Sequence, residues 1–409
     1  MKTDVQELAV LGGRPAFHEP LHVGRPNLGD RDRLLARIGE MLDRNWLTNN
    51  GPYVHEFEKR IADMVGVRHC IAMCSGTIAL EIAIRAAGLS GEVIVPSYTF
   101  VATAHALQWQ EITPVFCDID PITHTIDPRR VEQMITPRTT AVIGVHLWGR
   151  PCEIEQLTQI ADERNLTLMF DAAHAFGCSY RGRMIGGFGL AEVFSFHATK
   201  FLNSFEGGAV VTDRDDLAAR IRLMKNFGFS GYDNVIYVGT NGKMTEVAAA
   251  MGLTNLESIE GFTEANRRNY QAYRRSLSGL SGISVIDYDE TERCNYQYVV
   301  VDLDETRTGI SRDEMVGALQ AEGVLARRYF YPGCHRMEPY RSFFPHAGLL
   351  LPVTESLARR VLLLPTGTAV TVEDVETVCG IIRLAIGNAD AVRSGLAARA
   401  AGMSGVPVG

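Results

Sequence analysis

The chain has 409 residues, of which 46% are hydrophobic and 22% charged, so extensive disorder is not expected. This length exceeds what one hydrophobic core usually organises, and it predicts a large domain with a smaller companion. The formal net charge of -8 argues against a nucleic-acid partner, apart from a local basic patch. The eight cysteines show neither CxxC spacing nor the density of a small disulfide scaffold, so we expect reduced thiols.

The N-terminal residues predict neither a signal peptide nor a membrane span. Acidic residues Asp4 and Glu7 stand near the start, and a long apolar run is missing there. We therefore expect a cytoplasmic protein without a membrane partner.

Residues 31–260 carry the pattern of an α/β domain, preceded by an N-terminal arm over residues 1–30. Leu34, Ile38 and Met41 recur at helical spacing and predict an amphipathic helix over 31–46. Short apolar segments then alternate with helical stretches. This predicts a mixed, mostly parallel sheet, because crossover helices cover both faces and leave the strands apolar throughout. The expected strands are 92–95, 114–118, 140–146, 167–170, 192–196 and 209–212.

A helix over 258–277 is expected to lead into a smaller C-terminal α+β domain, over residues 261–390. Its predicted elements are a strand over 296–302, a helix over 312–322, a strand over 324–330 and a helix over 371–384. Residues 391–409 are rich in Ala and Gly without a sustained apolar face, so we predict a disordered tail there.

The segment Phe194-Ser-Phe-His-Ala-Thr-Lys200 follows one of the predicted strands. A lysine at such a place can be partly desolvated, and desolvation lowers its pKa enough to supply a free amine for a Schiff base. A lone lysine in a turn is more often a solvated surface residue. The interpretation therefore depends on what surrounds Lys200.

An acidic residue closes the preceding strand, in the segment Phe170-Asp171-Ala-Ala-His174. A carboxylate at the carboxyl end of a parallel strand lies where α/β sheets bind ligands, and one facing a pyridine nitrogen keeps that ring protonated. Asp171 would then make the ring an electron sink, and His174 could lie over a ring oxygen or ring face. The alternatives are a helix cap for Asp171 and a structural histidine.

Two further turns complete a predicted cofactor site. Ser75-Gly76-Thr77 precedes an apolar helical pattern, and a helix N-terminus with such hydroxyls can hold a phosphate. Phe100, in the turn after the strand ending at Val95, could stack on a pyridine face. Helix capping and core packing are the structural alternatives. Neither a phosphate-binding P-loop, a dinucleotide fingerprint nor an H-E-x-x-H zinc motif is present, and no metal is expected.

Together these motifs, in this order and spacing, resemble the DegT/StrS-type nucleotide-sugar aminotransferases of the aspartate aminotransferase-like fold type I. The likeness extends over about residues 10–390. Within the family the chain most closely resembles the dTDP-4-amino-4,6-dideoxyglucose transaminases of antibiotic sugar pathways. The segments that carry this narrower likeness are 146–152, 205–208, 226–229 and 239–241.

The resemblance implies a role for several residues. Lys200 would be the Schiff-base lysine of pyridoxal 5'-phosphate, and Asp171 would pair with the pyridine nitrogen. Ser195, Gly76 and Thr77 would bind the cofactor phosphate. The family is dimeric with shared active sites, so Asn241 would reach the phosphate in the partner subunit. Residues expected on the sugar side are Thr48, Tyr331 and His335.

The implied reaction moves an amino group from L-glutamate to C4 of dTDP-4-keto-6-deoxy-D-glucose. The pyridoxamine phosphate form of the cofactor would carry the amine into the second half-reaction. Three alternatives stay open: a C3 aminotransferase using a dTDP-3-keto-6-deoxyhexose, a sugar dehydratase on the same fold, and a binding or regulatory protein without chemistry. The dehydratases replace the lysine with histidine, so Lys200 argues against them.

Overall fold

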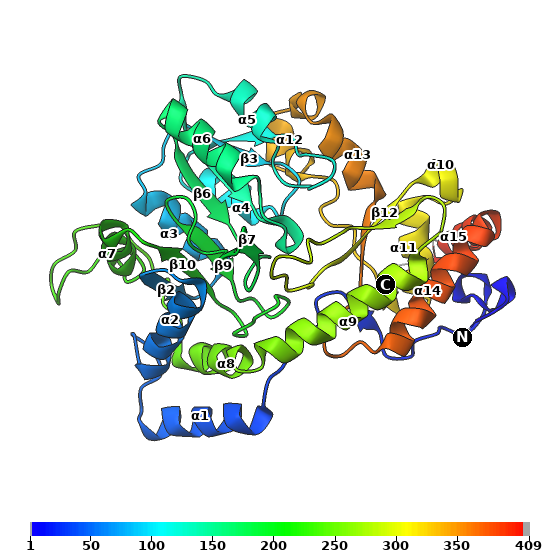
Figure 1. Ribbon diagram of the computed structural model, residues 1–409, viewed down its shortest axis with the longest axis horizontal. Helices are drawn as coiled ribbons and strands as arrows, with labels where there is room; N and C mark the ends of the chain where they lie inside the picture. Colours follow the sequence, from blue (N-terminus) through cyan, green and yellow to red (C-terminus); the bar gives the residue numbers. More distant parts are fainter. Residues whose placement is uncertain (1, 404–409) are drawn as a thin grey trace.

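The computed structural model describes residues 2–403, and a seven-stranded sheet forms the centre of the larger part (Figure 1). Its strand order is β2-β10-β9-β6-β5-β3-β4. β10 pairs antiparallel with both of its neighbours, whereas the other pairs are parallel. The predicted mixed, mostly parallel sheet is confirmed. The strands are β2 (His69–Met73), β3 (Glu92–Pro96), β4 (Thr113–Cys117), β5 (Thr139–Val145), β6 (Thr167–Asp171), β9 (Glu192–Ser195) and β10 (Gly208–Thr212).

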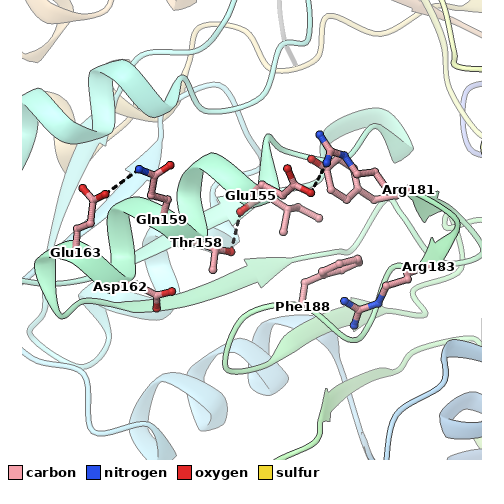
Figure 2. A pocket seen from close by; sticks show the side chains of 10 residues that line it. Glu155, Thr158, Gln159, Asp162, Glu163, Arg181, Arg183 and Phe188 are labelled. Carbon is pink, nitrogen blue, oxygen red and sulfur yellow. Dashed lines mark hydrogen bonds and ion pairs between the residues drawn. The ribbon is translucent and has the colours of Figure 1, made fainter.

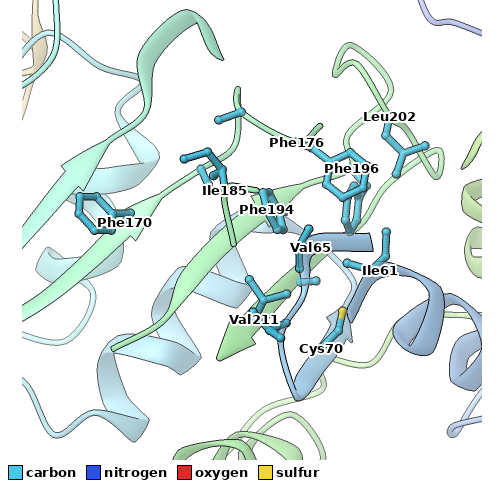
Figure 3. Packing of buried hydrophobic residues seen from close by; sticks show 14 of the residues in the cluster. Ile61, Val65, Cys70, Phe170, Phe176, Ile185, Phe194, Phe196, Leu202 and Val211 are labelled. Carbon is cyan, nitrogen blue, oxygen red and sulfur yellow. The ribbon is translucent and has the colours of Figure 1, made fainter. Parts of the chain in front are cut away.

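Helices cover both faces of this sheet, which explains the continuous apolar character of its strands. One buried cluster joins α2, α5, α6 and α8 to one face, and a second joins α3, α4 and α7 to the other. Figure 3 shows part of the first cluster, with Ile61 and Val65 of α2 against Phe194 and Val211 of the sheet. The helices are α1 (Arg31–Asp43), α2 (Pro52–Val65), α3 (Gly76–Ala86), α4 (Ala102–Gln108), α5 (Pro128–Met134), α6 (Ile154–Arg164), α7 (Asp215–Met224) and α8 (Glu246–Leu256).

The C-terminal part has its own three-stranded antiparallel sheet, in the order β11-β12-β14. A third buried cluster packs this sheet against three helices. The strands are β11 (Ile283–Val285), β12 (Val299–Leu303) and β14 (Val361–Leu364), and the three helices are α9 (Ile259–Leu277), α11 (Arg312–Ala321) and α14 (Val372–Gly387). Shorter helices are α10 (Glu305–Thr308), α12 (Tyr340–Phe343) and α13 (Pro352–Arg360).

Helix α9 joins the two parts (Figure 1). Its first turns contribute Ile259 and Phe262 to the core of the large sheet, and its later turns contribute Tyr270 and Tyr273 to the C-terminal core. This division of packing supports our proposal that the domains separate near residue 260.

The N-terminal arm packs on the C-terminal part, although the two are about 300 residues apart in the sequence. Leu8 and Val10 are buried in its core, and β1 (Leu21–His22) pairs in parallel with β13 (Val324–Leu325). β13 also corrects the strand predicted over 324–330, because only its first two residues form a strand. Beyond these two residues, the predicted range forms a single isolated β-bridge, between Arg327 and Leu363.

The prediction of a disordered tail is wrong over residues 391–403, which continue helix α15 (Ala389–Met403). Val392 is fully buried, and Leu396 packs against the same core. These two apolar residues are enough to hold the helix in place, because other helices pack over them. Residues 404–409 of that prediction lie outside the described residues. None of the described helices is long and apolar enough to cross a membrane.

Candidate active site

A cavity of about 390 Å³ lies at the carboxyl ends of the parallel strands. Parallel strands all deliver their following loops to the same edge of the sheet, which is why ligands bind there in α/β folds. Eight of the predicted site residues line this one cavity, although they come from four separate loops. They are Ser75, Gly76, Thr77, Phe100, Asp171, His174, Ser195 and Lys200.

Asp171 closes β6 with a carboxylate that is 6% exposed. Thr103 Oγ1 donates a hydrogen bond to Oδ2 at 2.8 Å, and the Ala173 N–H donates to Oδ1 at 3.1 Å. Burial raises the pKa of Asp171, while these hydrogen bonds and the charge of Lys200 act in the opposite direction. The carboxylate is therefore held in place, and a cationic N–H would stabilise its charge.

Lys200 lies just after β9, with its backbone N–H bonded to the His197 carbonyl at 2.8 Å. Burial lowers the pKa of the Lys200 side chain to about 8, although the Asp171 carboxylate raises it. The side chain makes no ion pair within residues 2–403. An appreciable share of neutral amine is therefore present near neutral pH, as a nucleophile requires.

The first turn of α3 forms a cradle beside the lysine. Ser75 caps the helix, because its Oγ accepts a hydrogen bond from the Ile78 N–H at 3.2 Å. A Cβ at Gly76 would lie 2.9 Å from Ser195 Cβ, so a larger residue would fill this space. The unpaired N–H groups of a helix N-terminus and the nearby hydroxyls suit a phosphate.

His174 is buried beneath the cavity and belongs to an aromatic stack. Its ring lies 4.4 Å from the Tyr298 ring and 5.9 Å from the Phe330 ring, between ring centres. Burial lowers the pKa of His174 well below its usual value, so the imidazole is neutral. Phe100 is 59% exposed and lies 6.5 Å from Phe330 at the cavity wall. Stacking of either ring on a cofactor stays a prediction.

Three predicted residues, besides His335, do not line this cavity. Asn241 lies on the surface, where its backbone bridges to Asn226, and Thr48 lies in the loop after α1. Tyr331 lines an adjoining groove. Their expected roles toward a partner subunit or a sugar stay predictions.

His335 is 2% exposed, and both of its ring nitrogens have partners inside the chain. Nδ1 lies 2.7 Å from Ser97 Oγ, and Nε2 lies 2.8 Å from Glu355 Oε1. Both ring nitrogens are thus engaged within the chain, and the expected role of His335 on the sugar side stays a prediction.

Sequence reasoning missed several residues that complete the cavity. Thr103 of α4 does not itself line the cavity but supports Asp171 from behind, and only that contact reveals it. Tyr298, Arg327 and Phe330 come from the C-terminal part, where no motif marked them. The dense aromatic and basic run 327–331 was the one signal available.

A second hollow, of about 520 Å³, lies between α6 and the hairpin of β7 (Ser179–Tyr180) and β8 (Arg183–Met184), and contains none of the predicted residues (Figure 2). Its polar groups mostly bind each other: Arg181 pairs with Glu155, and Gln159 bonds to Glu163. This hollow lacks the convergence of an amine, an acid and a helix N-terminus, so it is not our candidate.

Comparison with known proteins agrees with the cavity. The model of the DegT/DnrJ/EryC1/StrS aminotransferase family matches residues 30–383. The chain belongs to this family. A dTDP-4-amino-4,6-dideoxy-D-glucose transaminase from Shigella dysenteriae is 37% identical over 90% of this chain and 99% of that protein. A GDP-perosamine synthase from Caulobacter vibrioides is 35% identical over 88% of this chain and 96% of that protein.

Among solved structures, that of DesI in the presence of its TDP-sugar product is 54% identical, with a TM-score of 0.91 over 95% of this chain and 99% of that one. These findings confirm the predicted family, the predicted fold class and the prediction of an aminotransferase. The family depends on pyridoxal phosphate, and the arrangement of Lys200, Asp171 and the Ser75–Thr77 cradle fits that group.

Proposed function

We propose that this protein transfers the amino group of L-glutamate to C4 of dTDP-4-keto-6-deoxy-D-glucose, giving dTDP-4-amino-4,6-dideoxy-D-glucose for natural-product deoxysugar biosynthesis. The observation that carries the substrate class is the 54% identity with DesI, whose structure was determined with a TDP-sugar product. The named transaminase relative supports position C4.

Different residues of the cavity would bind different parts of the cofactor. Ser75, Gly76, Thr77 and Ser195 would hold the phosphate at the N-terminus of α3, and Asp171 would hold the pyridine nitrogen. When bound, pyridoxal phosphate supplies an aldehyde carbon for amine capture and a ring that withdraws electrons from it. The Asp171 carboxylate would hold a proton at the ring nitrogen, because a buried carboxylate is stabilised by a cationic N–H beside it.

Lys200 has two tasks in this proposal. Its amine anchors the cofactor, and a pKa of about 8 leaves enough neutral amine for that bond to form. Once the donor amine has taken its place, the freed Nζ would remove the proton from the donor α carbon and deliver it to the former aldehyde carbon of the cofactor. In the second half-reaction, starting from pyridoxamine phosphate, Nζ moves a proton to C4 of the sugar.

We also propose a homodimer with shared active sites, working in the cytoplasm. The segment 227–238 exposes a group of large apolar side chains, and such patches favour association. Its exposed members are Phe227, Phe229, Tyr232, Val235, Ile236 and Val238.

The decisive experiment incubates the holoenzyme with L-glutamate and, separately, with dTDP-4-keto and dTDP-3-keto sugars, and identifies each product by NMR. We expect stoichiometric release of 2-oxoglutarate and an amine on C4. Amination of the 3-keto sugar alone would move the activity to the C3 branch. Sugar consumption without consumption of glutamate would instead indicate a dehydratase.

A further inference from the structure

We propose that Arg327 is the binding residue for the diphosphate of the sugar nucleotide, and that the adjoining groove receives the nucleoside. This inference rests on the proposed function and adds the recognition of the nucleotide, which the cofactor motifs leave undefined. Its basis is a guanidinium without an acidic partner, fixed at the boundary between two hollows.

The backbone of Arg327 is held on both sides by strand β14. Its N–H donates to the Leu363 carbonyl at 3.1 Å, and the Leu363 N–H donates to the Arg327 carbonyl at 2.8 Å. The guanidinium lies 5.3 Å from the centre of the Tyr329 ring, which limits its direction. The base of this side chain is therefore rigid, although its end is exposed.

The neighbouring arginines differ from Arg327 in having a carboxylate. Asp313 binds Arg312 Nε at 2.7 Å and Arg328 Nη1 at 3.2 Å. Across residues 2–403, Arg327 makes neither an ion pair nor a side-chain hydrogen bond. Its donors are thus available to an anion, and a guanidinium binds phosphate oxygens in a bidentate manner.

Arg327 lines both the cavity of Lys200 and a groove of about 510 Å³. The two hollows share four more residues, so they adjoin: Thr99, Phe100, Tyr329 and Phe330. Beyond Arg327 the groove is lined mostly by apolar and aromatic side chains, with Tyr331 and Met337 among them, and also by Gln320 and Arg328. A planar base can pack on such a surface.

The order of these features matches the parts of a nucleoside diphosphate sugar. A hexose beside Lys200 places its diphosphate at the boundary and its nucleoside in the groove. The carboxylates of L-glutamate are a second possible anion for Arg327, but an amino acid needs no groove. The groove that adjoins the cavity therefore favours the diphosphate.

The test compares Arg327→Gln with the wild-type holoenzyme, using dTDP as the probe in isothermal titration calorimetry. We expect the Kd for dTDP and the KM for the keto sugar to rise by about tenfold to a hundredfold, as for a lost charged hydrogen bond. The KM for L-glutamate should stay within about twofold of wild type, because donor binding does not involve this arginine. Arg327→Lys should recover part of the dTDP affinity, since lysine keeps the positive charge but lacks the planar, bidentate set of N–H donors.

Arg307→Gln is the matched control, because Arg307 is also exposed in the C-terminal part without an ion pair, and lines neither hollow. It should bind dTDP like the wild type. Unchanged dTDP affinity in folded Arg327→Gln would overturn the inference, as would a rise in the KM for glutamate alone. If the wild type aminated neither sugar, the proposed function would fail, whereas the dTDP titration would still decide the role of Arg327.

Discussion

The two walls of the active-site cavity are built in different ways. On the cofactor wall, Ser75, Asp171 and Lys200 each follow a strand of one sheet, so the parallel topology brings them together. The opposite wall combines Tyr298 and Arg327 of the C-terminal part with Val23 of the N-terminal arm. We propose that the first wall holds the cofactor and that the second recognises the sugar nucleotide. Substitutions on the cofactor wall should therefore reduce turnover, and those on the opposite wall should change sugar recognition.

The largest effect is expected for Lys200→Ala on the cofactor wall. Loss of both the anchoring amine and the proton carrier should lower turnover by more than about a thousandfold. Steady-state assays with saturating cofactor, glutamate and keto sugar measure this. Near wild-type turnover in the variant would remove Lys200 from the mechanism.

Asp171→Asn keeps the shape of the side chain and removes its charge. We expect turnover to fall by about tenfold to a hundredfold, as for a lost charged hydrogen bond. Thr103→Val is the graded control, because it removes the 2.8 Å hydrogen bond to Asp171 and a longer one of 3.4 Å with Thr99 Oγ1, but leaves the carboxylate in place. It should cost less. Equal losses in the two variants would mean that position, rather than charge, is what Asp171 contributes.

The pH dependence of cofactor capture tests the environment of Lys200. Below its pKa of about 8 the lysine is protonated, so the neutral amine falls by about tenfold per pH unit. The rate at which apoprotein captures pyridoxal phosphate should therefore rise with pH and level off above about pH 8. Stopped-flow absorbance measures this rate. A rate still rising near pH 10 would show that burial does not depress the lysine pKa.

Gly76→Ala tests whether the cofactor site needs the close approach of the first turn of α3 to Ser195. The new Cβ would lie 2.9 Å from Ser195 Cβ, so the first turn of α3 must shift and weaken the phosphate contacts. We expect the cofactor to dissociate about tenfold faster, which is the size of one lost hydrogen bond. Gly39→Ala is the control, because its Cβ meets open space in helix α1. The control should retain cofactor and gain at most about 1 kcal/mol in stability.

The smallest effect is expected at His174, where the two walls meet. Its burial keeps the imidazole neutral, so its contribution is shape and packing rather than charge. His174→Gln should therefore keep turnover within about tenfold of wild type, near the cost of one neutral hydrogen bond. The pH profile of kcat should also be unchanged. A lost titration step between about pH 5 and 8 would show that His174 acts as an acid or base.

Much of the cofactor wall could be predicted from the sequence because its residues stand at strand ends. The apolar run ending at Asp171 and the turn before Lys200 are local patterns, and parallel pairing brings such turns to one edge. Most strands of the large sheet were predicted correctly for the same reason, because each is a short apolar run that can be recognised locally. The errors arose where burial depends on distant segments. Helix α15 folds because Val392 is buried under other elements of the C-terminal part.

By itself, then, the sequence determined the family, the fold class and the residues that meet at the strand ends, because these follow from short-range patterns. Only the tertiary structure decided which residues form the opposite wall. Within residues 2–403 Arg327 has no acidic partner, since Asp313 pairs with Arg312 and Arg328 instead. Its backbone is bridged to Leu363 of β14, and its side chain lines the cavity. Both features depend on contacts between residues that are distant in the sequence, and no local sequence pattern predicts such contacts.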